Sequence, residues 1–539
     1  MSVFRRKFLD TPPQAKPAFR FRLAAFGKTL GRWIFLLLCA AATAALVKYS
    51  YPRASYYALA WVAVAPFIMG LMRVKKLWGA FVYSWFTAVL LYGGVFWWVY
   101  RTCYEGGGMT VAQSYGAWLG LSALIGIQFA FWGSSCFFLK KLKFLFPVLA
   151  ACGWVALEWL HQTIAFYGLG FPWFMFGYSQ WNFPHALQLA SLTGVYGISF
   201  ALAFVGVAVG YAFSGKAGFK GGVFQVLVAG LLLGGVCAYG SWTLSRPEPK
   251  ALLSMQAAVM QPNIDQYKKW SPQFEEEILA TLKDMGAQLK DSGAMLAVWP
   301  ESAVPGALTE KTYFDLFDQI SVDAGVFQAV GSNIQADGKQ YVGAYVLSPF
   351  SQQLQEYRKI KLVPFGEYIP MENLVRKLAA DVEVLGELGS FTPGPVKQPL
   401  VQVSGIPVGL TVCYESIFPQ LWLVQNRAGA KLFVNVTNDA WFFDSDAPYQ
   451  HLAVNVLRAV ETGRPVLRSA NTGVSAIIDR FGHIMQSAPL NTRAILRGGV
   501  TLPINEAKNF YTQWGDWFAW VCAVFYFTLL ISTFVFAYE

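Results

Sequence analysis

The sequence predicts a bundle of membrane-spanning helices that carries one α/β domain outside the lipid. Three observations predict this fold class. Only 14% of the 539 residues are charged and 55% are hydrophobic, whereas soluble proteins carry about 25% charged residues. Several apolar stretches are long enough to cross a bilayer. One long polar region, residues 251–507, instead alternates apolar strands with amphipathic helical stretches.

The apolar stretches predict eight spanning helices, because a span needs about 20 residues. Seven precede the polar region and one follows it. They lie near residues 32–50, 54–73, 77–100, 110–139, 144–162, 183–213, 222–244 and 515–536. The predicted order is therefore an N-terminal segment (1–31), a transmembrane domain (32–250), the polar domain (251–507) and a C-terminal spanning helix (508–539).

Lysine and arginine are distributed unevenly between the loops. Sixteen of them fall in the N-terminal segment and in the loops after the second, fourth and sixth spans, and three fall in the other loops. Basic loops stay on the cytoplasmic side, so we expect both termini in the cytoplasm and the polar domain outside. The net charge of +11 is therefore explained by the membrane topology and does not indicate a nucleic-acid partner. A cleaved signal peptide is the alternative for the first span, but the charge alternation favours its retention.

A stretch rich in aromatic residues, glycine and proline lies between the fifth and sixth spans. Residues 168–180 are too broken for a span, and they predict an aromatic loop resting in the outer membrane interface. An anchoring belt and a lipid-handling segment are both open interpretations of this loop. Glu158, near the outer end of the fifth span, is expected to be an interface residue.

The polar region reads as an α/β domain whose sheet is covered by helices. We expect helices at 274–290, 313–324 and 449–462. We expect strands at 254–261, 295–299, 327–334, 341–347, 406–413 and 431–437, and further strands within 466–479.

Polar side chains follow three of these predicted strands. Glu301 follows Trp299-Pro300, Cys413 ends its strand, and Asn438 and Asp439 follow the strand at 431–437. Functional sites in open α/β sheets form where strands end, so these groups predict one shared site. Each also has a simpler interpretation: Glu301 as a helix cap, Cys413 as a core thiol, and Asn438 with Asp439 as a plain turn.

A carboxylate, an ammonium group and a thiol together suit nucleophilic catalysis. A thiol with its usual pKa of about 8.5 is mostly protonated at neutral pH, and a carboxylate can take its proton. A lysine can stabilise the resulting oxyanion. Lys359 and Lys361 are both candidates, in a loop-like segment rich in proline and glycine. The seven cysteines lack metal-binding spacing, and we expect no metal and no cofactor.

Several motifs in the chain resemble the nitrilase (carbon–nitrogen hydrolase) superfamily, and within it the membrane-bound apolipoprotein N-acyltransferase branch. The motifs are Trp299-Pro-Glu301-Ser302, Tyr357-x-Lys359-x-x-Leu-Val-Pro-Phe-Gly-Glu367, Val412-Cys413-Tyr414-Glu415 and Asn438-Asp-Ala-Trp-Phe442. Gln261-Pro-Asn-Ile-x-Gln-x-x-Lys-Trp270, the segment Phe171–Gln180 and Gly463-Arg-Pro-Val-Leu-Arg468-Ser-x-Asn471-x-Gly473 match the branch as well.

The resemblance implies a four-layer αββα domain with a Glu-Lys-Cys triad. Glu301 would be the general base, Cys413 the nucleophile and Lys359 the oxyanion-stabilising lysine, because the family lysine precedes the glutamate of its Pro-Phe-Gly-Glu motif by eight positions. That glutamate, Glu367, would support the lysine. The resemblance further assigns supporting roles to Tyr414 and Glu415 and substrate binding to Trp270, Asn438 and Trp441.

The implied activity is acyl transfer from a membrane phospholipid, through a cysteine thioester, to the α-amine of a diacylglyceryl lipoprotein. The implied setting is a monomer in a bacterial inner membrane, with the catalytic domain on the periplasmic side. Two other function classes compete with it. One is a membrane-tethered amidase or nitrilase acting on a small soluble substrate. The other is a non-catalytic transporter or scaffold with a degenerate domain.

Overall fold

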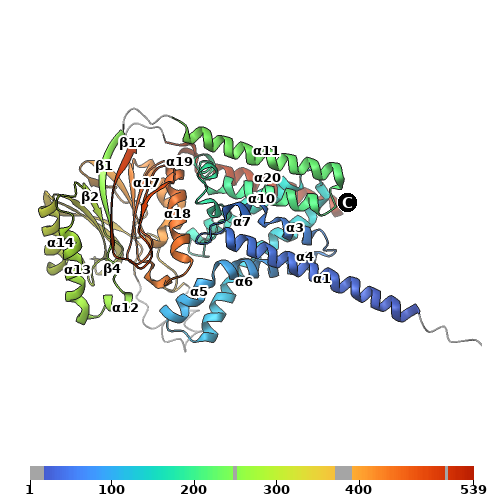
Figure 1. Ribbon diagram of the computed structural model, residues 1–539, viewed down its shortest axis with the longest axis horizontal. Helices are drawn as coiled ribbons and strands as arrows, with labels where there is room; N and C mark the ends of the chain where they lie inside the picture. Colours follow the sequence, from blue (N-terminus) through green and yellow to red (C-terminus); the bar gives the residue numbers. More distant parts are fainter. Residues whose placement is uncertain (1–16, 247–251, 371–390, 504–507, 539) are drawn as a thin grey trace, which may run out of the picture.

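A helical bundle and an α/β domain lie side by side in the computed structural model of the chain (Figure 1). The structure describes residues 17–246, 252–370, 391–503 and 508–538. The predicted domain boundaries near 250 and 507 fall outside the described residues. The bundle comprises α1 (Pro17–Ser50), α2 (Ala60–Ala63), α3 (Ala65–Leu71), α4 (Leu77–Val95), α5 (Trp97–Arg101), α6 (Val111–Leu139), α7 (Phe146–Phe166), α8 (Pro184–Leu187), α9 (Ala190–Thr193), α10 (Val195–Phe213), α11 (Gly218–Leu244) and α20 (Trp517–Tyr538).

Five described helical segments are long and apolar enough to cross a membrane: Thr29–Ser50, Leu77–Val95, Val111–Leu142, Val195–Phe213 and Gly218–Leu244. Tyr57–Leu71 and Trp517–Thr533 are shorter apolar helical segments. The expectation of several apolar spanning helices is therefore confirmed, whereas the count of eight stays a prediction.

The predicted span at 183–213 is wrong as a single helix. The short helices α8 and α9 come first, and α10 begins only at Val195. Gly194 separates α9 from α10 with a φ of 65°, a conformation that glycine adopts without steric cost. The span predicted at 32–50 is likewise only part of α1, which begins at Pro17.

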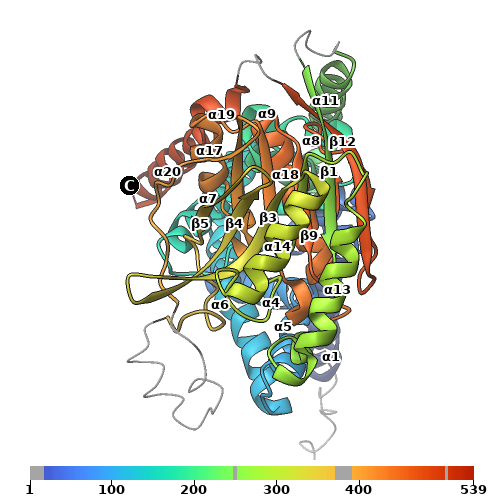
Figure 2. The same cartoon turned by 90° about the vertical axis from the view of Figure 1, so that its left-hand side faces the viewer.

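Two six-stranded sheets form the centre of the α/β domain (Figure 2). The first has the order β12-β1-β2-β3-β4-β5 and the second the order β11-β10-β9-β8-β7-β6. Their bounds are β1 Leu252–Gln261, β2 Leu296–Val298, β3 Phe327–Ala336, β4 Lys339–Ser348, β5 Ser351–Arg358, β6 Val401–Val403, β7 Ile406–Val412, β8 Leu432–Thr437, β9 Val466–Ala470, β10 Ala476–Ile478, β11 Ile484–Ser487 and β12 Ala494–Pro503.

Helices cover both outer faces of this pair of sheets. The amphipathic helices α13 (Glu275–Ala287) and α14 (Lys311–Ala324) cover the first sheet, and α17 (Pro419–Arg427) and α18 (Ala447–Thr462) cover the second. The result is the four-layer αββα arrangement that the resemblance implied. The central strands β1 to β3 and β7 to β9 run parallel within their sheets, which explains their nearly continuous apolar sequences.

The α18 layer lies between the second sheet and the helical bundle (Figure 1). All of its residues except Tyr449 are buried. Arg458 and Glu461 form a buried ion pair with atoms 2.8 Å apart, and Glu461 also accepts the backbone N–H of Val195 in α10 at 2.9 Å. The domain is thus packed onto the bundle through α18.

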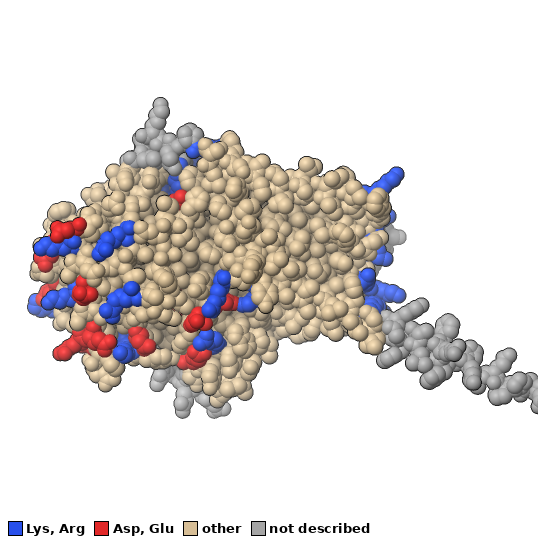
Figure 3. All heavy atoms as spheres, in the orientation of Figure 1, with Lys and Arg blue, Asp and Glu red and all other residues tan. Residues whose placement is uncertain are grey.

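Charge is absent from a broad band of the bundle surface seen in Figure 3. Lysine and arginine gather at the end of the bundle far from the sheets, while charges of both signs cover the α/β domain. The start of α1 and the end of α20 lie at that same far end (Figure 1). A charge-free band between two charged ends is the surface expected of a protein that spans a bilayer.

The aromatic segment between α7 and α8 is largely buried within the protein, although Gly168, Leu169 and Gly170 are exposed. Its position at the outer membrane interface stays a prediction. Residues 172–180 are all buried, and Trp173 donates to Gln450 in α18 at 2.8 Å. Glu158 accepts the Phe176 backbone N–H and the Trp154 indole N–H, each at 2.8 Å. Glu158 therefore holds this segment in place and is not a simple interface residue.

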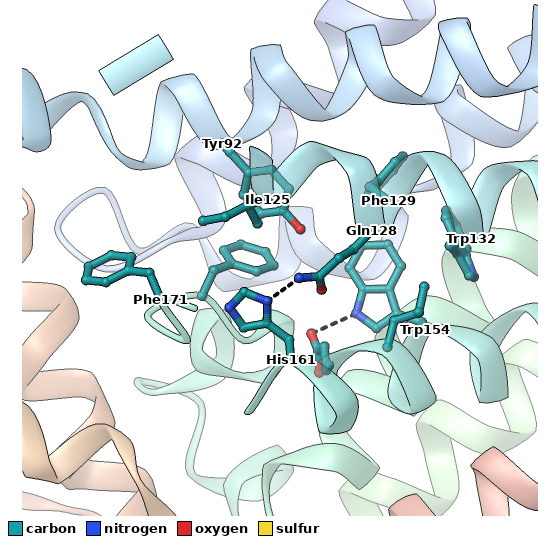
Figure 4. A pocket seen from close by; sticks show the side chains of 11 residues that line it. Tyr92, Ile125, Gln128, Phe129, Trp132, Trp154, His161 and Phe171 are labelled. Atoms are coloured by element: carbon teal, nitrogen blue, oxygen red, sulfur yellow. Dashed lines mark hydrogen bonds between the residues drawn. The ribbon is translucent and has the colours of Figure 1, made fainter. Parts of the chain in front are cut away.

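A cavity of about 40 Å³ lies beside this segment, between α4, α6 and α7. Figure 4 shows aromatic rings around it and the side chains of Gln128 and His161 pointing toward each other. Phe171 lines the cavity and also stacks on Tyr414 of the α/β domain, with ring centroids 6.2 Å apart. The bundle thus reaches the residue that follows Cys413.

Candidate active site

The strand-end side chains converge where the carboxyl ends of the two sheets meet. Glu301 follows β2, Lys359 directly follows β5, and Cys413 directly follows β7. Lys359 Nζ lies 3.1 Å from Glu301 Oε1, and Glu301 Oε2 accepts the backbone N–H of Asn438 at 3.0 Å. The structure therefore brings the predicted groups together from both sheets, as the strand-end argument requires.

Lys359 is completely buried between two carboxylates. Its Nζ lies 2.5 Å from Glu367 Oε1 and 3.1 Å from Glu301 Oε1. Burial alone would lower the pKa of Lys359, but the charges of Glu301 and Glu367 raise it well above its usual value. Lys359 therefore keeps its positive charge, which an oxyanion-stabilising group needs.

Lys361, the rival of Lys359 in the sequence, lies elsewhere. Its ammonium group donates to the backbone carbonyl of Phe166 at the end of α7 and lies over the Phe166 ring. Glu367 is fixed independently, because its Oε2 accepts the Val363 backbone N–H at 2.8 Å. The geometry thus agrees with the choice of Lys359 and with Glu367 as its support.

Cys413 begins a tight turn at the end of β7, with a φ of 49°. This left-handed conformation costs a non-glycine residue about 1–3 kcal/mol and is common at functional sites. Burial, with smaller contributions from the charges of Glu301 and Asp439, raises the pKa of the Cys413 thiol, and Lys359 opposes them. The resting thiol is therefore protonated and needs a base.

Glu415 ties the Cys413 turn to the Lys359 segment. Its carboxylate accepts the backbone N–H groups of Val412 at 2.7 Å and Ile360 at 2.5 Å. Tyr357 also donates its hydroxyl to Glu415 at 3.1 Å. Burial raises the pKa of Glu415 to about 7, although the backbone donors oppose the shift.

A buried charged cluster supports the far side of the Cys413 turn, and of its members only Asp439 was expected at the site from the sequence. Asp439 Oδ2 lies 2.6 Å from Arg468 Nη2, and Asp439 Oδ1 lies 2.9 Å from His451 Nδ1. His451 Nε2 lies 3.0 Å from the Cys413 carbonyl oxygen. Burial and the Arg468 charge lower the pKa of His451, so it stays neutral. Arg468 belongs to the motif that begins at Gly463, but the spacing of that motif does not indicate a contact with Asp439.

The predicted substrate-binding residues lie in different environments. Asn438 is buried and donates from its side chain to Gln266 at 2.6 Å. Trp270 and Trp441 are exposed, at 47% and 45% of their surface. Asn438 thus helps to build the site, while the two tryptophans present aromatic surface to the outside. Their roles in substrate binding stay predictions.

A cavity of about 450 Å³ opens beside Tyr414, the residue after the candidate nucleophile. Its wall combines the end of α7 and the residues after it with the segment that follows Lys359. Among the described residues that line it, Lys361 is the one charged residue, and the others are mostly aromatic and aliphatic. The cavity therefore lies between the helical bundle and the residues that follow Lys359 and Cys413, and its wall is mostly apolar.

Comparisons with known proteins agree with this architecture. The family model for the carbon–nitrogen hydrolases matches residues 256–503, and that for the apolipoprotein N-acyltransferase N-terminal domain matches residues 43–208. An apolipoprotein N-acyltransferase of Geobacter metallireducens is 36% identical to this chain over 506 residues, which cover 90% of this chain and 92% of that protein. The chain belongs to the apolipoprotein N-acyltransferase family.

Other relatives extend this finding across bacteria. The apolipoprotein N-acyltransferase of Pseudomonas syringae pv. tomato is 31% identical over 92% of this chain and 96% of that protein. Among solved structures, a carbon–nitrogen hydrolase from Helicobacter pylori G27 is similar over 46% of this chain and 89% of that one, with 15% identity and a TM-score of 0.35. The resemblance drawn from the motifs is confirmed, and with it the assignment of the chain as a membrane acyltransferase.

Proposed function

We propose that this member of the apolipoprotein N-acyltransferase family moves an acyl chain from a membrane phospholipid to the α-amine of a diacylglyceryl-cysteine lipoprotein. The observation that carries the proposal is the position of the cavity beside Tyr414. It places a mostly apolar wall, shared with α7 of the helical bundle, next to the turn of Cys413. A lipid acyl chain needs such a wall, whereas a small polar amide does not.

In the first half-reaction, Cys413 Sγ attacks the ester carbonyl carbon of the phospholipid. Glu301 accepts the thiol proton, and Lys359 stabilises the negative charge on the carbonyl oxygen. The ester C–O bond then breaks, and Glu301 passes the proton to the departing lysophospholipid oxygen. The acyl chain is left on Cys413 as a thioester, which is the covalent intermediate of a ping-pong reaction.

In the second half-reaction, the neutral α-amine of the lipoprotein attacks the thioester carbonyl carbon. Lys359 again stabilises the oxyanion, and Glu301 takes a proton from the attacking nitrogen. The C–S bond breaks as the amide forms, and Glu301 returns the proton to Cys413. Atoms and charges balance over the cycle without a diffusible cofactor, and we propose no metal in either step.

We further propose eight spanning helices with both termini in the cytoplasm of a bacterial cell. The catalytic domain then lies on the periplasmic side of the inner membrane, and the enzyme acts as a monomer. Two features support this orientation: the basic end of the bundle lies far from the sheets (Figure 3), and α1 begins and α20 ends there (Figure 1). Basic ends face the cytoplasm.

The relatives that cover most of the chain are apolipoprotein N-acyltransferases, which counts against the membrane-tethered amidase considered from the sequence. Such an amidase would need the triad but no contact between the site and the bundle. Two contacts favour acyl transfer over it: Phe171 stacks on Tyr414, and the end of α7 lines the cavity. Incubating the purified full chain with a phospholipid or with a soluble amide separates the two functions.

Mass spectrometry of the purified protein tests the acyl carrier directly. We expect an adduct of acyl-chain mass on Cys413 after incubation with phospholipid, removable by neutral hydroxylamine, which cleaves thioesters. C413S should carry no such hydroxylamine-sensitive adduct. Hydroxylamine-sensitive labelling of C413S at the wild-type level, or turnover of soluble amides without any lipid adduct on the wild type, would contradict the proposal.

A further inference from the structure

A lysine side chain lines the mostly apolar cavity beside the candidate nucleophile. The cavity, of about 450 Å³, includes Tyr414, which directly follows Cys413. Among the described residues that line it, Lys361 carries the charge, and the others are mostly aromatic or aliphatic. A charged group costs free energy in an apolar wall unless a partner or water compensates it, so the position of Lys361 calls for an explanation.

The contacts of the Lys361 ammonium group do not neutralise its charge. The group donates to the backbone carbonyl of Phe166, the last residue of α7, and lies 3.8 Å from the centroid of the Phe166 ring. An ammonium group has three N–H donors, and in the part of the chain that the structure describes no carboxylate forms an ion pair with this one. Lys359, by contrast, lies between the carboxylates of Glu301 and Glu367.

Glu415 contacts Lys361 through the backbone and not through the ammonium group. Its buried carboxylate accepts the backbone N–H groups of Ile360 at 2.5 Å, Val412 at 2.7 Å and Lys361 at 3.2 Å. The carboxylate oxygens are thus occupied by backbone donors. The Lys361 backbone is held against the turn that begins at Cys413, while the Lys361 side chain lines the cavity.

A phosphodiester is the anion that this arrangement fits. A mostly apolar wall suits a hydrocarbon chain, and lysine binds phosphate as a point charge. A glycerophospholipid carries both groups, with its phosphate only a few bonds from its esters. Lys361 lies two positions after Lys359, so their Cα atoms are at most about 7 Å apart. This separation suits a lipid whose ester oxygen is stabilised by Lys359 while its phosphate contacts Lys361.

We propose that Lys361 binds the phosphate of the phospholipid acyl donor and thereby selects this donor against esters that lack a phosphate. The selection matters because the diacylglyceryl group of the lipoprotein acceptor carries two esters of its own and no phosphate. In the first half-reaction the phosphate contact favours attack on the phospholipid over attack on those esters. The inference rests on the proposed acyl transfer from a phospholipid.

The test measures lipid binding at the site with lipids that cannot acylate the enzyme. Iodoacetamide alkylates Cys413 in the purified full chain, and mass spectrometry of the Cys413 peptide gives the rate. Ether-linked phosphatidylglycerol, or the dialkylglycerol with the same chains, is added to the detergent micelles as a protecting ligand. We expect K361M to need about tenfold more of the ether phospholipid for half protection, with unchanged protection by dialkylglycerol. K361R should match the wild type.

Two further variants separate the phosphate contact from a structural role. Lys397 is exposed and lies four positions after Pro393, which lines the cavity, so K397M should match the wild type. K361Q keeps an N–H donor for the Phe166 carbonyl without the charge; it should behave as K361M does, and it replaces K361M if that variant does not fold. Equal weakening of protection by both lipids in K361M, wild-type protection in K361Q, or no protection of the wild type by the ether phospholipid would overturn the inference.

Ester lipids then test the selection itself. We expect K361M to form the Cys413 acyl adduct from phosphatidylglycerol about tenfold more slowly and from diacylglycerol at the wild-type rate. Weaker protection of K361M by the ether phospholipid, without any acyl adduct on the wild type, would uphold Lys361 as the phosphate contact and reject the proposed acyl transfer. A normal acyl adduct on the wild type with equal protection of the wild type and K361M would do the reverse.

Discussion

Glu415 accepts the backbone N–H of Ile360 at 2.5 Å. Together with the bonds that Glu415 accepts from the Lys361 backbone and the Tyr357 hydroxyl, it joins the turn that carries Cys413 to the segment that carries Lys359, although Ile360 and Glu415 lie 55 positions apart in the chain. The nucleophile and the oxyanion-stabilising group come from different sheets. The distance between Cys413 and Lys359 therefore depends on the side chain of Glu415, which belongs to neither β5 nor β7.

Replacing Glu415 with glutamine should disconnect the two segments. The carboxylate accepts N–H groups from Ile360, Lys361 and Val412, and a glutamine offers one acceptor oxygen and turns N–H donors toward some of them. Each buried donor left without a partner costs about 1–3 kcal/mol. We expect E415Q to lower the melting temperature and to reduce acyl-thioester formation more than tenfold, on the order of 1.4 kcal/mol or more.

The control for this change is Glu356→Gln in β5. Glu356 is 39% exposed and pairs with Arg358 at the surface, so E356Q should melt and react as the wild type does. Wild-type thioester formation in E415Q would mean that the link between the two segments is dispensable.

Removing the candidate base should make Cys413 reactivity depend on direct ionisation of the thiol. Burial is the largest cause of the raised Cys413 pKa, so the thiolate stays rare at neutral pH even when the Glu301 charge is absent. We expect E301Q to slow acylation at neutral pH about a hundredfold or more. The rate of alkylation should then rise steadily as the pH is raised, where that of the wild type levels off.

Mass spectrometry of the Cys413 peptide measures both rates in E301Q. If the alkylation rate of E301Q levelled off at the same pH and the same rate as that of the wild type, a group other than Glu301 would be accepting the Cys413 proton.

Breaking the buried pair of Asp439 and Arg468 should destabilise the domain strongly. Both side chains are 0% exposed, with the charged atoms 2.6 Å apart. Loss of the carboxylate charge leaves the Arg468 guanidinium buried without compensation, which costs about 3–5 kcal/mol. We expect D439N to melt well below the wild type in a thermal unfolding assay.

Asp444 offers the comparison for D439N, because its carboxylate is 62% exposed and pairs with Arg53 at 2.7 Å. D444N should lower the free energy of unfolding by no more than about 1 kcal/mol. Equal melting temperatures for D439N and D444N would contradict the structural role of the buried pair.

Gly331 in β3 allows the Glu301 backbone to approach closely. A Cβ at this position would lie 2.4 Å from the Pro300 carbonyl oxygen and 2.5 Å from Glu301 Cα. Since a backbone contact cannot rotate away, G331A must displace Glu301 from Lys359. We expect at least about a tenfold loss of acylation and roughly 1–3 kcal/mol of destabilisation.

Gly120 in α6 is the control for G331A, because a Cβ there meets no atom within 4 Å. G120A should therefore keep full activity, and full activity in G331A as well would mean that Glu301 tolerates the displacement.

Most of the α/β domain could be predicted from local patterns. The strands near 254–261, 327–334 and 431–437 were expected because their apolar residues are continuous or alternate. The strands β5 (Ser351–Arg358), β6, β11 and β12 were missed. β5 lacks that signal, because its first three residues are exposed and its sequence is largely polar. An edge strand of this kind is defined by its hydrogen bonds to β4, which its own sequence does not reveal.

Glu301 and Cys413 were also accessible to sequence reasoning, because each lies at or just after a predicted strand end, whereas only the family motif selected Lys359 over Lys361. The supporting groups were not accessible in this way. His451 lies in the middle of α18, and its contact with the Cys413 carbonyl exists only because that helix packs beneath the turn. Lys269 has an exposed lysine as its neighbour, so nothing local distinguishes the buried side chain from the solvated one.

The sequence by itself determined the apolar spanning segments, the α/β character of the domain and the membership in the acyltransferase family, because each depends on the order of residue types along the chain. The tertiary structure decided which polar groups are buried together. It packed residues 172–180 against α18, separated Lys359 from Lys361, and enclosed Lys269 without a hydrogen-bond partner among the described residues. The physical reason is that the energy of a buried charge depends on partners from distant segments, and those become neighbours only when the layers close.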